Sequence, residues 1–245
     1  MSASIYWGLA QAAEAPLDHP EEFLSASEAA KYASLRFPKR RQEWELGRWA
    51  GKRLFQSLRG HWSLRLADIE IHNMPDGAPF IVLPGRAGTP GCLTISHCEQ
   101  MALCGFVSGM DLRIGVDLEK VELRSRAFVE DYFTPVEHDL VESFPDELRT
   151  RLVNLIWSAK ESMLKALGVG LHWDTRKVEL WQIDGLYPFH PETAEWHRMR
   201  LGDCEVTSRR WQGWWRSHGD FILTMACFAP KSQSLRSVRL VEKSI

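Results

Sequence analysis

Three acidic side chains are the first candidates for chemistry in this sequence. Asp117 and Glu119 lie two residues apart in segment 112–119, whose apolar alternation predicts a half-buried strand. Side chains two apart on a strand point to the same face, and neighbouring carboxylates repel each other unless a cation relieves them. Carboxylate oxygens suit Mg²⁺ or Mn²⁺. The pair could therefore form a divalent metal site, but on its own it favours the alternative, an exposed acidic sheet edge.

A predicted helix over residues 148–167 supplies the third acid. Trp157, Glu161 and Lys165 are spaced by four and therefore share one face of that helix. Glu161 would complete the metal site, and Lys165 would hold a phosphate one turn away. The alternative is a surface ion pair between Glu161 and Lys165, worth a few tenths of a kcal/mol. Trp157 on the same face is unusual for a solvated surface.

Two further groups have residue types that bind ligands. Ser96 and His97 end a short predicted strand and precede a loop, a common place for functional side chains. Arg48 and Lys52 lie four apart on a predicted helix over 41–58, where they form a cationic stripe. That stripe would bind an anion, and the alternative is an ordinary solvated face.

Composition restricts the class of protein. The 245 residues carry a net charge of −2, which argues against a general nucleic-acid binder. The five cysteines are odd in number and scattered, which favours a reducing compartment. The N-terminus lacks the basic residues of a signal peptide, and the longest apolar run, 221–229, is too short to span a membrane. We therefore expect a cytoplasmic protein with neither nucleic acid nor membrane as partner.

Helix and strand patterns predict an α+β fold of two lobes, 1–111 and 112–245, with a groove between them. In both halves, helices precede a meander of strands. Capping boxes at Ser25–Glu28 and Thr134–Glu137 mark helix starts. Gly213 and Gly219 are predicted hairpin turns, and the tail after Pro230 is predicted to be loose. Helices are predicted at 41–58, 128–132, 134–144 and 148–167, and strands at 66–72, 80–83, 93–96, 101–107, 112–119, 178–183, 196–201, 204–211, 214–218 and 221–228.

The motifs together resemble those of a known family. Gly115–Glu119, read as G-V-D-L-E, resembles the G-[IV]-D-[IVL]-E motif of the 4′-phosphopantetheinyl transferases of the larger surfactin-synthetase-activating (Sfp-like) type. Trp157–Lys165 resembles their W-[ST]-x-K-E-[AS]-x-x-K motif, at the right distance from the first. Thr94–His97, Gly47–Lys52 and Gly219–Ala226 are similar to three further family segments, so the resemblance spans nearly the whole chain.

The resemblance implies a fold and an activity. The fold would be two pseudo-symmetric lobes, each a small antiparallel sheet packed with a long helix, in a monomer with coenzyme A in the cleft. The enzyme would move the phosphopantetheine arm of coenzyme A onto a serine of an apo acyl or peptidyl carrier protein. The products would be holo carrier protein and adenosine 3′,5′-bisphosphate. Asp117, Glu119 and Glu161 would bind Mg²⁺, with Mn²⁺ as an alternative.

The resemblance also implies roles for single residues. Lys165 would neutralise the pyrophosphate, and His97 and Arg48 would hold the nucleotide end with its 3′-phosphate. Glu161, directly or through a metal-bound water, would take the serine proton. The catalytic set is Glu161, Lys165 and His97. The coenzyme A set is Arg48, Lys52, Gly77, Pro79, Ser96, His97 and Lys165. The carrier would dock near Arg124, Arg126 and the helix over 134–144.

One departure from the family pattern concerns coenzyme A. Where many members read G-K-P, this chain reads Gly77-Ala78-Pro79, so a phosphate-contacting lysine is missing. Lys52, Arg86 or a backbone N–H would replace it, or affinity for coenzyme A would be lower. The sequence leaves the carrier and its pathway open. It also leaves two other functions open, a metal-dependent phosphohydrolase acting on a nucleotide and a non-catalytic protein that binds carrier domains.

Overall fold

The computed structural model describes residues 2–58, 63–109, 112–186, 195–203, 210–229 and 237–245. Internal contacts divide the chain into two compact units. Unit 1 comprises residues 1–110 with 236–245, and unit 2 comprises 111–235. The first predicted lobe, 1–111, ends close to this boundary. The second predicted lobe, 112–245, is longer than unit 2, because residues 236–245 belong to unit 1.

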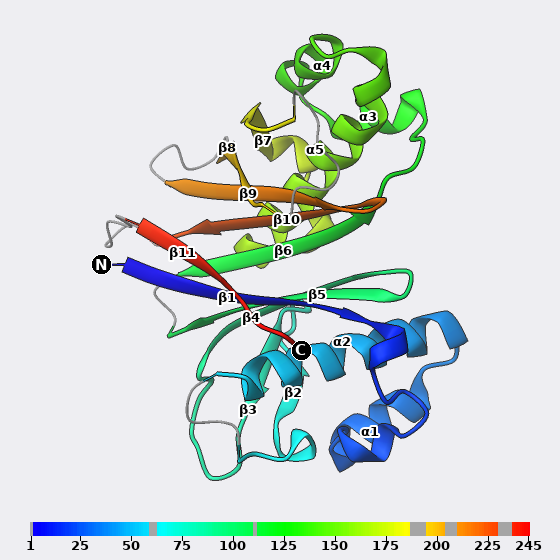
Figure 1. The fold of residues 1–245 in the computed structure, drawn as a ribbon, viewed down its shortest axis with the longest axis vertical. Coiled ribbons are helices and arrows are strands. Elements are labelled where there is room, and N and C mark those ends of the chain that lie inside the picture. The colour runs from blue at the N-terminus through cyan, green and yellow to red at the C-terminus, as the bar shows by residue number, and fades with distance from the viewer. Residues whose placement is uncertain (1, 59–62, 110–111, 187–194, 204–209, 230–236) are drawn as a thin grey trace. The chain divides into compact units, whose positions relative to one another are not determined.

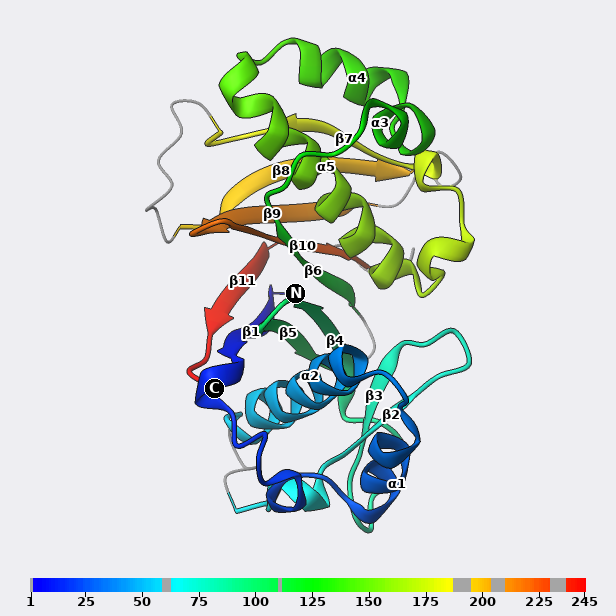
Figure 2. The same cartoon turned by 90° about the vertical axis from the view of Figure 1, so that its right-hand side faces the viewer.

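Unit 1 is a four-stranded sheet with a long helix on one face. The sheet order is β11-β1-β5-β4, with β1 parallel to β11 and antiparallel to β5. Helix α2 lies against β1, β4 and β5 and buries the apolar stripe Leu46, Trp49, Ala50 and Leu54 (Figure 2). The elements are β1 (Ser2–Gln11), α1 (Ala26–Ser34), α2 (Pro38–Gln56), β2 (Glu70–Asn73), β3 (Pro79–Val82), β4 (Gly91–Cys98), β5 (Met101–Ser108) and β11 (Ser237–Glu242).

Three predictions for unit 1 were wrong or incomplete. The supposedly loose tail forms β11, and Ile245 beyond it packs onto the core of the unit. A side chain at position 8 would meet Ile245 at 2.8 Å, which explains Gly8 in β1. Strand β1 itself was not predicted. The strand expected over 66–72 is shortened to Glu70–Asn73, because residues 66–68 form a 3₁₀ turn.

Unit 2 is a five-stranded antiparallel sheet in the order β6-β10-β9-β8-β7. Helix α5 packs along one face of it (Figure 1). The elements are β6 (Arg113–Lys120), α3 (Arg126–Tyr132), α4 (Pro135–Glu142), α5 (Asp146–Leu167), β7 (Val178–Ile183), β8 (His197–Asp203), β9 (Trp211–His218) and β10 (Phe221–Phe228). The predicted hairpin turn at Gly219 is confirmed by its positive φ of 57° between β9 and β10.

The turn predicted at Gly213 is wrong. Gly213 lies inside β9, and a Cβ there would come within 2.5 Å of the Leu201 side chain on β8. Glycine is therefore needed for close packing and not for a bend. The strand predicted over 204–211 falls mostly outside the described residues. No helix among the described residues is long and apolar enough to cross a membrane.

The α+β fold is confirmed, and the two units repeat one arrangement. Strands β1-β5-β4 with helix α2 correspond to β6-β10-β9 with helix α5. The hairpins β4–β5 and β9–β10 have turns of equal length, which aligns Met101 with Phe221. Their partners in the first strand of each unit are Gln11 and Lys120. Counting back from this pair places Gly8 and Ala10 at the positions of Asp117 and Glu119.

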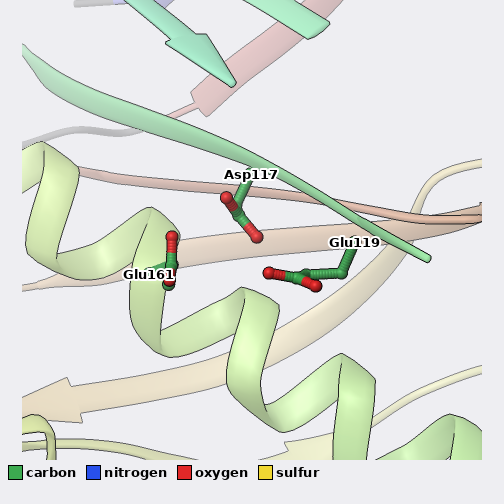
Figure 3. Close-up of side chains that lie close together, drawn as sticks. All are labelled: Asp117, Glu119 and Glu161. Atoms are coloured by element: carbon green, nitrogen blue, oxygen red, sulfur yellow. The ribbon is translucent and has the colours of Figure 1, made fainter. Parts of the chain in front are cut away.

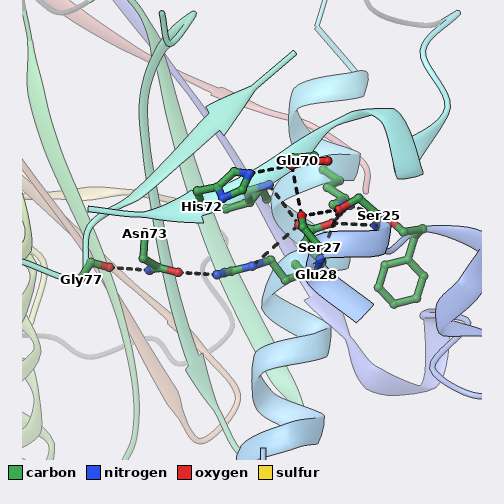
Figure 4. A network of polar contacts seen from close by, with 11 residues as sticks. Ser25, Ser27, Glu28, Glu70, His72, Asn73 and Gly77 are labelled. Carbon is green, nitrogen blue, oxygen red and sulfur yellow. Dashed lines mark hydrogen bonds and ion pairs between the residues drawn. The ribbon is translucent and has the colours of Figure 1, made fainter. Parts of the chain in front are cut away.

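A buried glutamate–lysine pair occurs at the same place in both units. In unit 1, Ser25 and Glu28 form the predicted capping box of α1, and Glu28 also pairs with Lys52 of α2 (Figure 4). The second oxygen of Glu28 accepts the N–H of Ile71 at 3.0 Å. Both charged side chains are almost fully buried.

Unit 2 repeats this arrangement group for group. Thr134 and Glu137 form the predicted capping box of α4, Glu137 pairs with Lys160 of α5 at 2.7 Å, and Glu137 accepts the N–H of Leu180 at 3.0 Å. Burial is the largest influence, raising the pKa of Glu137 and lowering that of Lys160, while each partner's charge opposes it. Lys52 and Lys160 both close a W-x-x-K sequence, Trp49–Lys52 and Trp157–Lys160. This repeat aligns Arg53 with Glu161.

Candidate active site

The three predicted metal ligands come together in unit 2. Asp117 and Glu119 project from β6 and Glu161 from α5, and one oxygen of each lies within 4.8 Å of the others (Figure 3). Gly115 allows this approach, because a Cβ there would lie 1.9 Å from the backbone oxygen of Ser162 on α5. The glycine of the G-V-D-L-E motif thus lets the helix pack directly on the strand that carries the acids.

The electrostatics of the cluster favour a bound cation. Asp117 is only 1% exposed, and the Glu119 and Glu161 side chains are 18% and 19% exposed. Burial, followed by the nearby charge of Asp117, raises the pKa of both Glu119 and Glu161 to about 7. Without an ion, both carboxyls therefore keep their protons to a higher pH than exposed glutamates do. A divalent cation would restore the charged forms.

Lys165 lies beside the acids, as the helical spacing predicted. Its ammonium is 2.5 Å from an oxygen of Asp117 and 3.6 Å from one of Glu161. Burial alone would lower the pKa of Lys165, but Asp117 and Glu161 outweigh it and the pKa is raised. Lys165 is thus a permanent positive charge next to the carboxylates, and its side chain remains 30% exposed.

Three hydrogen-bond donors around the acids were not foreseen from the sequence. Ser158 donates to Asp117 at 2.8 Å. Trp157 donates its indole N–H to one Glu119 oxygen at 3.1 Å, and Arg124 donates to the other at 2.8 Å. Trp157 and Ser158 could have been found, because they lie one turn before Glu161 on the same helix. Arg124 lies in a loop, and no periodicity signals its position.

Two cationic residues expected to bind coenzyme A have internal partners. Lys52 is fully buried and donates to Glu28 and to the Phe23 carbonyl. Arg48 is 6% exposed, donates to Asn73 at 2.6 Å and lies over the Trp44 ring at 4.6 Å. Binding a phosphate at Lys52 would break buried contacts, whereas the buried Nε of Arg48 has no hydrogen-bond partner among the described residues, and the role of Arg48 at the nucleotide stays a prediction. Lys52 therefore does not replace the lysine missing at position 78.

Arg48 also supports the turn that carries the G-A-P sequence. Asn73, which accepts from Arg48, donates its own amide to the Gly77 carbonyl at 2.6 Å (Figure 4). Gly77 has a φ of +90°, which favours glycine. Pro79, two residues later, begins β3.

The other unit 1 candidates lie at the end of β4. Ser96 is buried, and His97 has a side chain 29% exposed whose Nδ1 is 3.8 Å from Glu43. The hairpin that follows contains Glu99 at φ +53°, a conformation that costs a non-glycine residue about 1 kcal/mol. His97 remains a candidate for anion binding. Arg86, the other possible substitute for the missing lysine, is exposed in the loop between β3 and β4.

The side chains present fit a hard divalent cation. All three are carboxylates, which are the oxygen ligands preferred by Mg²⁺ and Mn²⁺. Burial, and after it the charge of Asp117, disfavours the ionised forms of Glu119 and Glu161, and a cation would favour them. Asp117, Glu119 and Glu161 would hold the ion.

Comparison with known proteins identifies the family. Residues 113–226, which contain all three acids, match the model of the 4′-phosphopantetheinyl transferase superfamily. The chain is 30% identical over 166 residues to the 4′-phosphopantetheinyl transferase HetI of Nostoc sp. strain PCC 7120, covering 64% of this chain and 67% of HetI. It is also 30% identical over 120 residues to the human L-aminoadipate-semialdehyde dehydrogenase-phosphopantetheinyl transferase, covering 45% of this chain and 38% of the human protein.

Solved structures give a weaker likeness. A holo-(acyl-carrier-protein) synthase from Bacillus anthracis, in complex with coenzyme A (3′,5′-ADP), aligns with a TM-score of 0.37 and 24% identity, over 43% of this chain and 95% of the synthase. The family model and the match to HetI carry the assignment, and the chain belongs to the 4′-phosphopantetheinyl transferase superfamily.

Proposed function

We propose that this chain moves the 4′-phosphopantetheine arm of coenzyme A onto a serine hydroxyl of an apo carrier protein, using a Mg²⁺ ion held by Asp117, Glu119 and Glu161. The chain is a 4′-phosphopantetheinyl transferase by family. The observation that carries the finer proposal is the convergence of three carboxylates within 4.8 Å inside the matched region. The two repeated units favour the larger, Sfp-like type.

In the proposed reaction, the serine oxygen forms a bond to the phosphorus that carries the pantetheine arm. The bond from that phosphorus to the bridging oxygen breaks, and adenosine 3′,5′-bisphosphate leaves with the electron pair. A bound Mg²⁺ would polarise the phosphoryl group and stabilise charge on the leaving phosphate. Lys165 would add a second positive charge at the pyrophosphate. Its ammonium lies beside Asp117 and Glu161, so it is close to the proposed metal site.

Glu161 is our candidate for the group that takes the serine proton. Both oxygens of Glu119 are already engaged by Trp157 and Arg124, whereas Glu161 meets Lys165 at 3.6 Å. A bound cation would lower the Glu161 pKa from its ion-free value of about 7 and make the carboxylate a weaker base, which favours the route through a metal-bound water.

His97 is proposed to hold the nucleotide end of coenzyme A, with Ser96, Gly77 and Pro79 beside the same ligand. The carrier is proposed to dock near Arg126 and α4. Leu123, Tyr132 and Val136 are apolar and exposed in this region of unit 2. Arg124 is less suited to docking, because Glu119, Glu122 and Asn154 already engage it. The monomeric state and cytoplasmic location stay predictions.

The test is a panel of purified apo carrier proteins incubated with the chain, coenzyme A and Mg²⁺, read by intact-protein mass spectrometry. At least one carrier from a fatty-acid, polyketide, nonribosomal-peptide or siderophore system should gain one phosphopantetheine group, and chelator should stop the reaction. If every carrier stays unmodified, the proposal fails.

The same reactions separate the other two functions that the sequence left open. A nucleotide phosphohydrolase would release phosphate from coenzyme A in the tube without carrier. A protein that only binds carriers would form a complex that is indifferent to chelator and leaves the carrier mass unchanged.

A further inference from the structure

The two carboxylates of β6 are each held by donors from the helix that supplies the third acid. We propose that Ser158 and Trp157 are positioning residues, which fix the Asp117 and Glu119 carboxylates in the converged geometry that a divalent ion needs. The inference rests on the proposed metal site and extends it to residues that touch neither the ion nor the substrate.

The Ser158 hydroxyl contacts both Asp117 and a second hydroxyl. Ser158 is fully buried and lies 2.8 Å from Asp117 Oδ2 and 2.8 Å from the Thr224 hydroxyl. Thr224 lies directly opposite Asp117 in the pairing of β6 with β10, and its hydroxyl donates to the Ser158 carbonyl at 2.9 Å. Ser158 donates its single proton to Asp117, because a carboxylate is a stronger acceptor than the Thr224 hydroxyl. The other Asp117 oxygen receives Lys165.

The indole of Trp157 is fixed by packing so that its N–H meets Glu119. Its ring makes edge contacts with Phe128 and Tyr132, at centroid distances of 4.9 and 5.2 Å. The N–H then reaches Oε1 of Glu119 at 3.1 Å. Arg124 approaches Oε2 from the other side, and its guanidinium lies 5.2 Å from the Phe128 ring centroid.

The donors Ser158 and Trp157 counteract the repulsion between the carboxylates of the cluster. Asp117 and Glu119 lie on one face of β6 with Glu161 beside them, and like charges favour rotamers that move the carboxylates apart. A donor on each β6 acid compensates part of that repulsion before any ion arrives. Partners of this kind around metal ligands typically change metal affinity by about 10- to 100-fold when removed.

Comparison with unit 1 distinguishes a positioning role of Trp157 and Ser158 from a packing role. Trp49 occupies the place of Trp157, so the tryptophan ring packs on the core in both units. Ala50 occupies the place of Ser158, and the β6 acids are replaced by Gly8 and Ala10. The serine hydroxyl thus occurs where there is an acid to hold, and what is special about Trp157 is its N–H contact with Glu119.

The test is a Mn²⁺ titration of the full chain by electron paramagnetic resonance, without coenzyme A. Ser158→Ala and Trp157→Phe should each weaken Mn²⁺ binding by about 10- to 100-fold. Ser158→Thr, which keeps the hydroxyl, should stay close to wild type. Trp49→Phe is the matched control in unit 1 and should leave Mn²⁺ affinity unchanged. Circular dichroism should show all four variants folded.

The outcomes separate this inference from the metal site itself. If the wild type binds Mn²⁺ and both Ser158→Ala and Trp157→Phe bind it equally well, the positioning roles are wrong and the metal site stands. If the wild type binds no Mn²⁺, the proposed site and this inference both fail. Should Trp157→Phe not fold, Ser158→Ala with its threonine rescue decides the question alone.

Discussion

Unit 1 and unit 2 use the same framework but differ where the chemistry is expected. Both bury a capping-box glutamate against a lysine of the long helix, and in both that glutamate also accepts a backbone N–H of the strand that follows the helix. At the positions of Asp117 and Glu119, unit 1 has Gly8 and Ala10. Arg53 stands at the position of Glu161.

The difference separates stability from function in this fold. The buried ion pair occurs with and without the acid cluster, so it supports the helix and sheet and is not part of the metal chemistry. The acid cluster occurs in one unit among the described residues, together with the donors Ser158 and Arg124. Breaking the buried ion pair of either unit should therefore lower stability. Metal-dependent transfer should respond to changes at the acids of unit 2.

The largest effect is expected from changing a proposed ligand. Asp117→Asn and Glu161→Gln should each reduce transfer at least about 1,000-fold, or about 4 kcal/mol, because a bound ion contributes several kcal/mol of charge stabilisation. Initial rates with an accepted carrier measure this. Glu70→Gln, an acid in the polar network of unit 1, is the control and should stay near wild type. Near-wild-type rates in both ligand variants would contradict the assignment of the metal site to unit 2.

The next largest effect tests the shared framework. Lys52→Met and Lys160→Met should each lower the free energy of unfolding by about 3 to 5 kcal/mol, since each leaves a buried glutamate without its charge partner. Urea denaturation measures the change. Arg126→Met, which removes an exposed ion pair with Glu130, should change it by less than about 1 kcal/mol. A large loss in one unit alone would show that the two pairs are not equivalent.

Lys165→Met should separate metal binding from transfer. The ammonium repels an incoming cation and occupies an oxygen of Asp117. Its removal should tighten Mn²⁺ binding without coenzyme A by roughly tenfold, or ~1.4 kcal/mol, within the range for charges a few ångströms apart. Transfer should fall in the same variant, because the pyrophosphate loses a positive partner. Weaker Mn²⁺ binding would show that Lys165 supports the site in some other way.

Stability should depend on pH through the acids of unit 2. Glu119 and Glu161 have a pKa of about 7 in the folded chain against an ordinary value of 4.5, so the folded state binds more protons between these pH values. Without a metal ion, the contribution of these two groups to the free energy of unfolding is therefore fully present below pH 4.5. It is lost as the pH rises through about 7.

Mg²⁺ should reverse this loss, because it would bind the deprotonated carboxylates. The increase in melting temperature on adding Mg²⁺ should therefore be larger at pH 8 than at pH 5.5. Thermal unfolding of wild type and Asp117→Asn measures it, and the variant should show little increase at either pH. An equal increase at both pH values in the wild type would contradict the assigned pKa shifts.

The smallest effect concerns equivalent hairpin turns. Glu99 in unit 1 has a φ of +53° where unit 2 has Gly219 at +57°. Glu99→Gly should stabilise the chain by about 1 kcal/mol, because glycine adopts this conformation without strain. The reverse change, Gly219→Ala, should destabilise it by a similar amount. If Glu99→Gly instead destabilises the chain, contacts of the Glu99 side chain outweigh the strain.

Sequence patterns predicted the parts of the fold that rest on local physics. The capping boxes, the turn at Gly219 and the long helix of unit 2 follow from short-range rules, and the structure confirms them. The approach of Asp117, Glu119 and Glu161 was also expected, because strand and helix spacing place each acid on a defined face.

What the sequence missed depends on contacts between distant segments. Strand β11 is held by β1, more than 200 residues earlier in the chain, so its own pattern did not reveal it. Lys52 looked like part of an exposed cationic stripe because nothing nearby in sequence identifies Glu28 as its buried partner. The W-x-x-K repeat at 49–52 and 157–160 was present, but only the buried pairs show what it means.

The most direct test of the central claim is the number of divalent ions bound per chain. A Mn²⁺ titration of the wild type should give one ion per chain, and Asp117→Asn should lose it while remaining folded. Two equivalent ions per chain would contradict the restriction of the site to unit 2. An ion that survives in the folded Asp117→Asn chain with unchanged affinity would place the metal elsewhere.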